Sequence, residues 1–229
     1  MVGEGMKRAV ILLASLVVGA GFVIAVGFFF SRVVNPDVTY PMLAATNEGT
    51  VDTPRGPMPH AVLQVSSWAD SEAGECHGPD GGEHPGWVTF CPTTNFQLPA
   101  NSYVTIRVEQ YDGGEVITNP YFAQVHGTAD GAALLNGEKF TAIPPDTVGH
   151  TFTIRGIPSP DQDDMFVSVP LMASHDENVT PNVVEFSFYT GSPGTYYWNC
   201  EFPCGDGTYA NFGGPMSAQG YMAGIVEVV

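Results

Sequence analysis

Hydrophobic residues follow two different patterns along this chain. Residues 9–30 form an apolar segment without a single charged residue. About 20 consecutive apolar residues are enough to span a bilayer as a helix. Beyond residue 60 the apolar residues instead come in short runs, in which they alternate with polar ones. The pattern therefore predicts one N-terminal transmembrane helix followed by β-structure.

The short alternating runs predict the strands of the second part. Turn-rich segments separate them, and 27 glycines and 19 prolines supply residues for many turns. No stretch after the apolar segment has a helical period. Strands at this spacing favour an all-β sandwich. The clearest runs are Tyr103–Glu109, His150–Arg155, Met165–Val169, Val183–Tyr189, Gly194–Cys200 and Met222–Val229.

The apolar segment is interpreted as an uncleaved signal anchor. It is longer than the core of a typical signal peptide, and the residues after Phe28 do not resemble a small-residue cleavage site. A cleaved signal peptide is the alternative. Lys7 and Arg8 precede the segment and only Arg32 closely follows it. This asymmetry predicts a single-pass protein of the cell membrane, with residues 1–8 in the cytoplasm and the C-terminal domain extracellular or periplasmic.

Residues 31–60 differ from the strand-forming part in composition. They are rich in proline, glycine, threonine and asparagine, which is typical of a stalk or linker. The first alternating run after them begins at Ala61. We therefore expect a stalk over residues 31–60 and one folded domain over residues 61–229.

The part of the chain beyond the anchor is strongly acidic. After residue 33 there are four basic residues and 23 acidic ones, a net charge of −19. Nucleic acids are excluded as partners by this balance, because phosphates require a basic surface. An acidic surface favours a basic protein partner, since complementary potentials speed their encounter. A solvated acidic surface without a partner is the alternative.

All four cysteines fall on the predicted outer side, where an oxidising environment favours disulfides. Four cysteines allow three pairings, and the simplest joins Cys76 to Cys91 and Cys200 to Cys204. The first pair brackets a loop rich in glycine and acidic residues. A zinc site made with the two histidines of that loop has a spacing that fits no known zinc motif.

The second cysteine pair has another interpretation, as metal ligands. Cys200 and Cys204 lie on a turn between two apolar strands, which brings their sulfurs close together. His150 begins one predicted strand and Met222 begins the last one. Imidazole, thiolate and thioether groups placed in this way are the parts of a copper site in a β-sandwich.

At these residues the chain resembles the cupredoxins, and within them the copper-A domain of cytochrome oxidase subunit II. The likeness covers about residues 61 to 229. It is carried by Leu98–Ile106, His150–Ile154, Pro193–Cys200 and Met222–Val228. The resemblance implies a cupredoxin-like Greek-key β-sandwich that binds copper. A single N-terminal anchor is also found in the shorter members of the subunit II family.

The resemblance also implies a ligand set. His150 matches the first imidazole ligand, and Cys200 and Cys204 match the two bridging thiolates of the family's C-x-x-x-C-G motif. Met222 matches the weak thioether ligand, in the closing M-x-G-x-V-x-V pattern.

The chain departs from the family at three points. Gln219 stands where the family has a second histidine, three residues before Met222, and no histidine follows His175. Phe202 stands midway between the cysteines, where the family has a carbonyl-donating glutamate. The longer loop before Gln219 contains a second thioether, Met216. Gln219 could supply an amide oxygen, as glutamine does at some blue-copper sites.

One further histidine could replace the missing imidazole. His126 precedes a predicted turn and could approach the same end of the sandwich.

Three functions are consistent with these residues. The first is copper-dependent electron transfer, from a basic donor such as a cytochrome c to a membrane partner that includes other oxidase subunits. In that role the chain is not catalytic by itself. The second is a structural or interaction subunit without metal, closed by a Cys200–Cys204 disulfide. The third is delivery of Cu(I), because sulfur-rich ligand sets favour that ion.

Overall fold

The fold is taken from a computed structural model that describes residues 3–34, 40–76, 78, 84, 86–114, 119–156, 159–202, 204 and 214–229. The chain divides into two compact units, Met1–Thr39 and Tyr40–Val229. Each unit is described by itself below.

The first unit contains one helix, α1 (Glu4–Val34). Its residues Glu4–Phe29 form a segment that is long and apolar enough to cross a membrane. The expected span, residues 9–30, lies inside α1. A signal sequence near an N-terminus can meet the same criteria of length and hydropathy.

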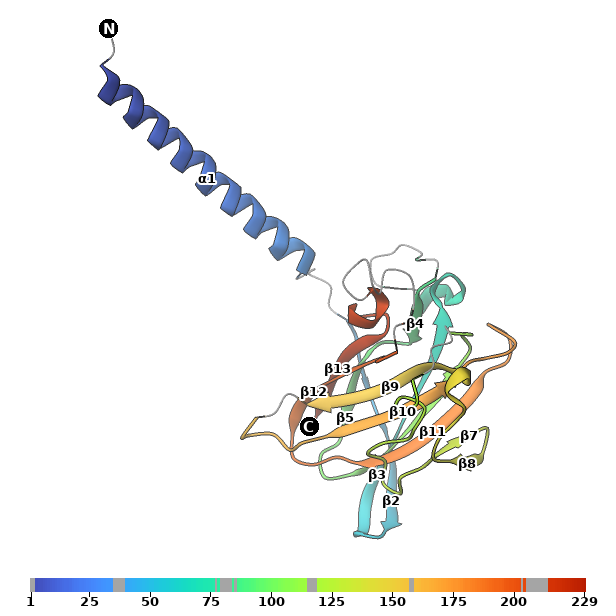
Figure 1. The fold of residues 1–229 in the computed structure, drawn as a ribbon. Coiled ribbons are helices and arrows are strands. Elements are labelled where there is room, and N and C mark those ends of the chain that lie inside the picture. Colours follow the sequence, from blue (N-terminus) through green and yellow to red (C-terminus); the bar gives the residue numbers. More distant parts are fainter. Residues whose placement is uncertain are drawn as a thin grey trace. The chain divides into compact units, whose positions relative to one another are not determined.

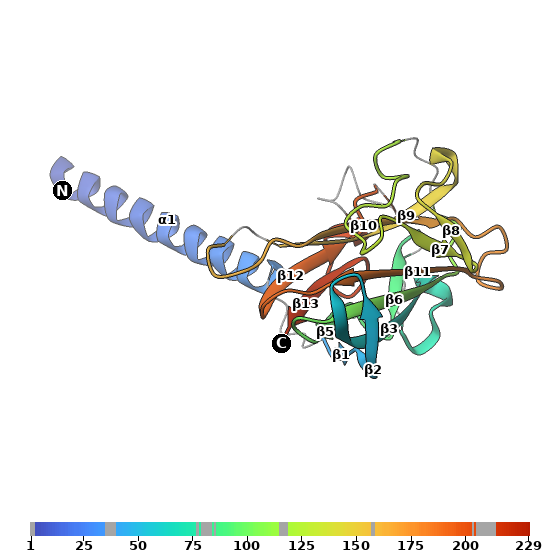
Figure 2. The ribbon, with the colours of Figure 1, turned by 90° about the horizontal axis from the view of Figure 1, so that it is seen from below.

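The second unit is a β-sandwich of two sheets (Figures 1 and 2). The first sheet has the order β1-β5-β13-β12-β9-β10. Its strands are β1 (Met42–Ala44), β5 (Asn95–Leu98), β13 (Ala223–Val228), β12 (Gly194–Asn199), β9 (Val148–Gly156) and β10 (Phe166–Met172).

The second sheet has the order β2-β3-β6-β11-β7-β8, and β4 pairs with β3 off this path. Its strands are β2 (Thr46–Thr53), β3 (Gly56–Ala69), β4 (Val88–Cys91), β6 (Tyr103–Gln110), β7 (Ala133–Leu135), β8 (Glu138–Phe140) and β11 (Asn182–Tyr189). The chain passes repeatedly from one sheet to the other, as in Greek-key sandwiches. The all-β sandwich predicted from the sequence is confirmed.

The alternation seen in the sequence becomes the inner face of each sheet. In β6 the side chains of Val104, Ile106 and Val108 are fully buried, while Arg107 and Glu109, which alternate with them, are half-buried. Phe152 and Ile154 of β9 join the same core from the other sheet. Burying these faces against each other is what holds the two sheets together.

The expected stalk is wrong for most of its length. Strands β1 and β2 and the first part of β3 occupy residues 42–60, and the compact unit begins at Tyr40. β2 is polar and mostly exposed, so it has no buried face that the sequence could reveal. Backbone hydrogen bonds to β3 hold it in the sheet instead. Residues 35–39 of the expected stalk lie outside the described residues.

A cluster of aromatic rings forms the centre of the core around Trp198. The ring of Phe152 stacks on Trp198 with centroids 4.5 Å apart, and Phe96 stacks on it at 5.5 Å. Trp198 Nε1 donates a hydrogen bond to the Thr94 carbonyl at 2.6 Å. Gly224 pairs with Trp198 across β12 and β13, and a Cβ there would lie 1.8 Å from Thr94 O. A larger residue at 224 would therefore separate β13 from this cluster.

We expect Phe152→Ala to lower the free energy of unfolding by about 3–5 kcal/mol, because it leaves a cavity beside the Trp198 ring. Chemical denaturation of the detergent-solubilised chain, followed by tryptophan fluorescence, measures the change. Val179→Ala is the control, since Val179 is exposed. A loss at Phe152 no larger than that of the control would contradict the assignment of this cluster as the core.

Candidate metal centre

Three predicted ligands lie together in the folded domain. The ligand atoms of His150, Cys200 and Cys204 all lie within 4.8 Å of one another, and all three residues are buried. His150 Nδ1 is 3.0 Å from Cys204 Sγ and 4.0 Å from Cys200 Sγ, and the two sulfurs are 3.4 Å apart. Among the described histidines, cysteines and carboxylates, this is the group with the geometry of a metal site.

Pairing between β9 and β12 brings these residues together across 50 positions of sequence. Asn199 at the end of β12 is paired with Thr153 of β9. Beyond this pair, Glu201 N–H donates to Thr151 Oγ1 at 2.8 Å, and Thr151 N–H donates to Cys200 Sγ at 3.4 Å. The chain after β12 is therefore held against β9 at the turn where the cysteines lie.

The four cysteines divide into one bonded pair and one unbonded pair. Cys76 and Cys91 form a disulfide, as expected from the sequence. Cys200 and Cys204 are not bonded to each other, because their sulfurs stand 3.4 Å apart. The disulfide considered for this pair is therefore not formed in the structure, and both sulfurs are available as ligands.

Backbone carbonyls complete the surroundings of the sulfurs. Phe202 O lies 3.5 Å from Cys200 Sγ, and Gly149 O lies 3.4 Å from Cys204 Sγ. The residue between the cysteines presents a carbonyl whatever its side chain. Phe202 can therefore offer this backbone oxygen without a polar side chain.

Asp112 is a member of the site that sequence reasoning missed. Its Oδ2 lies 2.7 Å from His150 Nε2, and it also accepts a hydrogen bond from Gly114 N–H at 2.6 Å. A carboxylate on the outer nitrogen fixes the orientation and tautomer of a metal-binding imidazole. Asp112 is 38 residues from His150, so no spacing motif could have revealed the contact.

The buried imidazole and the two buried sulfurs share charge with one another and with Asp112. Burial opposes an imidazolium, but Asp112 and Cys200 outweigh it and raise the pKa of His150 to about 9. Burial disfavours the Cys200 thiolate and by itself raises the pKa of that thiol. Hydrogen bonds with Cys204 and His150 outweigh burial and hold the pKa of Cys200 well below its usual value. His150 Nδ1 lies closer to Cys204 Sγ than to Cys200 Sγ, and the two sulfurs are in contact. We therefore assign the negative charge to the two sulfurs together and not to Cys200 alone. Metal binding at Nδ1 must therefore displace a proton.

The two candidate thioethers lie in different surroundings. Met216 Sδ accepts a hydrogen bond from Cys204 N–H at 3.1 Å, so this sulfur lies directly at the ligand loop. Met222 is fully buried in the core. Its carbonyl accepts from Cys200 N–H at 3.0 Å, which fixes the backbone of Met222 next to that of Cys200. Its role as a ligand stays a prediction.

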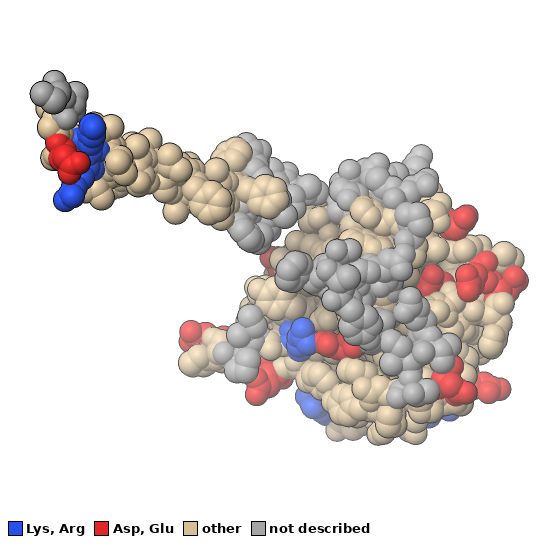
Figure 3. All heavy atoms as spheres, turned by 45° about the horizontal axis from the view of Figure 1, so that its top comes forward, with Lys and Arg blue, Asp and Glu red and all other residues tan. Residues whose placement is uncertain are grey.

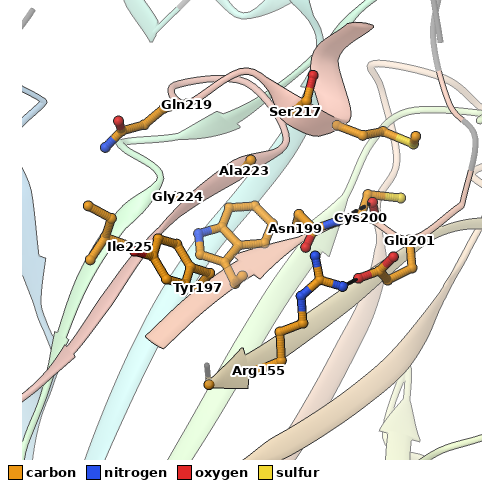
Figure 4. A pocket seen from close by; sticks show the side chains of 13 residues that line it. Arg155, Tyr197, Asn199, Cys200, Glu201, Ser217, Gln219, Ala223, Gly224 and Ile225 are labelled. Atoms are coloured by element: carbon orange, nitrogen blue, oxygen red, sulfur yellow. Dashed lines mark hydrogen bonds and ion pairs between the residues drawn. The ribbon is translucent and has the colours of Figure 1, made fainter. Parts of the chain in front are cut away.

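Gln219 is engaged elsewhere. Its side-chain Nε2 donates to Asn95 Oδ1 at 2.9 Å, and Asn95 Oδ1 also accepts from Ile225 N–H at 3.1 Å. A pocket of about 650 Å³ lies beside Cys200. Figure 4 shows the Gln219 amide on the opposite side of this pocket from Cys200. Gln219 therefore binds Asn95 of β5, which also accepts from β13, rather than facing the sulfurs.

His126 does not replace the missing imidazole. Its ring stacks on Tyr121, and its Nε2 lies 3.1 Å from the Tyr121 carbonyl oxygen. It is not a member of the group formed by His150 and the two cysteines.

No family model and no curated protein sequence matches the chain. Among solved structures, auracyanin B is 15% identical, with a TM-score of 0.34, and the match covers 81% of this chain and 98% of that one. The copper protein rusticyanin is 14% identical, with a TM-score of 0.36 and coverage of 81% and 88%. An auracyanin from Roseiflexus castenholzii is 11% identical, with a TM-score of 0.35 and coverage of 73% and 96%.

These neighbours are cupredoxins, and the likeness concerns the fold alone. Identities and TM-scores this low carry nothing about copper or electron transfer to this chain. The finer resemblance to the copper-A domain of subunit II stays a prediction.

We expect Asp112→Asn to weaken metal binding about 10–100-fold, because the imidazole loses the carboxylate that orients it. A competition titration of the reduced full-length chain against a chromophoric Cu(I) chelator measures the affinity. Asp130→Asn is the matched control, since Asp130 is an exposed acid paired with Lys139. Equal affinities for the two variants would show that Asp112 does not orient His150.

Proposed function

We propose that the chain is a membrane-anchored copper protein that transfers electrons. The observation that carries the proposal is the buried group of His150, Cys200 and Cys204, with ligand atoms within 4.8 Å of one another. Thiolate and imidazole donors suit copper, and the thioether of Met216 beside Cys204 adds a soft donor of the kind that copper accepts. When bound, copper supplies a one-electron couple between Cu(II) and Cu(I).

The protein's contribution is a rigid, dry set of donors. His150 is fixed by Asp112 on one ring nitrogen and lies on β9, while Cys200 is tied to β9 through Thr151. A site held by two paired strands changes little in geometry between oxidation states. Little rearrangement favours fast electron transfer, and burial keeps water away from the sulfurs.

The remaining parts of the proposal concern the cellular setting. In this proposal, α1 is a single-pass anchor in the cell membrane and the sandwich faces the exterior or the periplasm. The domain receives electrons from a basic protein such as a cytochrome c and passes them to a membrane partner. A role as a subunit-II-like component of a respiratory oxidase fits this setting. The net charge of −19 beyond the anchor supports the basic donor.

Delivery of Cu(I) is the second candidate, and one observation favours it. Met216 brings a third sulfur to the ligand loop, 3.1 Å from Cys204 N, and His150 is the one imidazole in the group of described ligand residues. A sulfur-rich set stabilises Cu(I) over Cu(II). Tight Cu(I) binding without reversible redox cycling would favour delivery over electron transfer.

Copper reconstitution of the reduced, detergent-solubilised chain tests the site. We expect an intense thiolate-to-copper absorption band and an electron paramagnetic resonance signal, and Cys200→Ser should abolish both by removing one thiolate. The double variant Cys76→Ser, Cys91→Ser lacks the disulfide but should keep both signals. An unchanged spectrum in Cys200→Ser would overturn the metal assignment. Metal analysis that finds zinc but no copper would do so as well, since two cysteines and one histidine also suit zinc.

We expect Met216→Leu to lower the reduction potential on the order of 60 mV, a tenfold loss of preference for Cu(I) in a one-electron couple. The reason is the loss of a soft donor at the ligand loop. Protein-film voltammetry of the copper-loaded chain measures it. Gln219→Leu is the control, because that amide is bonded to Asn95, and its potential should stay near that of the unmodified chain. The reverse pattern would make Gln219 the additional ligand.

A further inference from the structure

Asp70 is a buried carboxylate beside the loop that the Cys76–Cys91 disulfide closes. Several acidic side chains lie on the visible face of the domain (Figure 3), whereas Asp70 is only 1% exposed. It is the one buried acid among the described residues. Burying a carboxylate is costly unless its oxygens accept hydrogen bonds. The position of Asp70 therefore depends on the groups that donate to it.

These donors come from the disulfide-closed loop and from β4. Asp70 Oδ1 accepts from Gly78 N–H at 2.8 Å, and Oδ2 accepts from His84 N–H at 2.9 Å. The hydroxyl of Thr89 donates a further hydrogen bond to Oδ1. Asp70 directly follows β3, and Thr89 lies on β4, which pairs with β3. One carboxylate thus fixes two points of the loop against two paired strands.

The same loop holds the ring of Tyr221. The rings of His84 and Trp87 stack at 4.5 Å, and the Tyr221 ring meets both of them edge-on, at 5.5 and 4.7 Å. Gly78 also touches this ring, because a Cβ at Gly78 would overlap it. We call Gly78, His84 and Trp87 the loop clamp. The Tyr221 carbonyl is held as well, since it accepts from Phe90 N–H at 3.1 Å.

Tyr221 belongs to a compact turn of the backbone. Its N–H donates to Ala218 O at 3.2 Å. The N–H of the next residue, Met222, donates to Pro215 O at 3.1 Å. These two hydrogen bonds join the start of the turn to its end, so residues 215–222 move as one unit.

This turn carries both candidate thioethers. Met216 lies near its start, and its Sδ accepts from Cys204 N–H at 3.1 Å. Met222 lies at its end, and its carbonyl accepts from Cys200 N–H at 3.0 Å. A displacement of the Tyr221 ring is therefore transmitted to both thioethers and to the backbone beside both cysteines.

We propose that the loop clamp positions the two thioethers at the metal centre by holding Tyr221, which makes Asp70 and Gly78 positioning residues of that centre. Neither residue belongs to the ligand group of His150 and the two cysteines. Residues outside a ligand set tune a metal by fixing the orientation of its ligands. The effect on copper rests on the proposed function, whereas the link from the clamp to the thioethers can be measured without copper.

A loop that only stabilises the fold is the alternative, and a matched glycine separates the two. A Cβ at Gly191 would overlap the carboxylate of Asp163, so Gly191→Ala crowds a neighbour just as Gly78→Ala does. Gly191 precedes Gly194, which pairs with Val228 at the end of β13 far from Met222. Crowding at Gly191 should therefore cost stability without disturbing the thioethers.

The link is tested by NMR on the full-length chain in detergent micelles, without copper and with isotope-labelled methionine methyl groups. Met216→Leu and Met222→Leu identify the two signals. Gly78→Ala drives a methyl group against the Tyr221 ring, and Asp70→Asn replaces an acceptor oxygen by an amide nitrogen that cannot accept. We expect both variants to shift both signals, and Gly191→Ala to leave them in place.

The effect on copper is tested by protein-film voltammetry of the copper-loaded chain. We expect Gly78→Ala and Asp70→Asn to lower the ratio of Cu(I) to Cu(II) affinity about threefold, which is about 30 mV in a one-electron couple. The reason is that displaced thioethers stabilise Cu(I) less. Gly191→Ala should keep the potential of the unmodified chain, because a loss of stability alone does not change the ligands.

Each part can fail separately. Methyl signals that move no further in Gly78→Ala and Asp70→Asn than in Gly191→Ala would overturn the link, and Asp70→Asn decides alone if Gly78→Ala does not fold. Shifted signals with an unchanged potential would overturn the positioning role. Shifted signals in a chain that takes up no copper would reject the proposed electron transfer and support the link.

Discussion

The pairing of β9 with β12 is the constraint on which the candidate centre depends. It sets His150 and Cys200 at the same end of one sheet, and Thr151 ties the two strands together beyond their last paired residues. The aromatic cluster of Trp198 and Phe152 packs between these same strands and the opposite sheet. Core packing and ligand geometry therefore have a common origin, and a change that loosens the cluster should also loosen the site.

Burial makes this arrangement both costly and useful. A thiolate and an imidazolium are expensive to bury, and they persist because each has charged or hydrogen-bonding partners. Asp112 supplies the outer partner of His150, and the two cysteine sulfurs share the negative charge. A metal cation at Nδ1 and the two sulfurs would replace the proton of His150 with a better partner for the same thiolates.

The residues inserted between β6 and β9 extend the site toward the surface. They carry β7, β8 and the segment with Tyr121, Phe122 and His126. Phe122 packs on Phe202 inside the ligand loop, while Tyr121 remains exposed. The same segment therefore helps to bury the centre and also forms part of the outer surface.

The sequence by itself determined the class of fold and most of the candidate ligands. Alternating runs gave the strands because a strand with one buried face must alternate. Cys200 and Cys204 were visible because both lie on one turn, where short spacing guarantees proximity. The polar strand β2 was mistaken for a stalk, because its place in the sheet depends on backbone bonds to β3 and not on a buried face.

Only the tertiary structure decided the rest, because it depends on contacts between residues distant in sequence. It placed Asp112 on His150 across 38 positions and turned Gln219 toward Asn95 rather than the sulfurs. It also kept Cys200 and Cys204 from forming a disulfide, joined Cys76 to Cys91, and brought Phe122 onto Phe202. Composition and spacing determine only the geometry of residues close together in the sequence. The partner of a side chain depends on how the two sheets and their loops pack, which brings distant residues into contact.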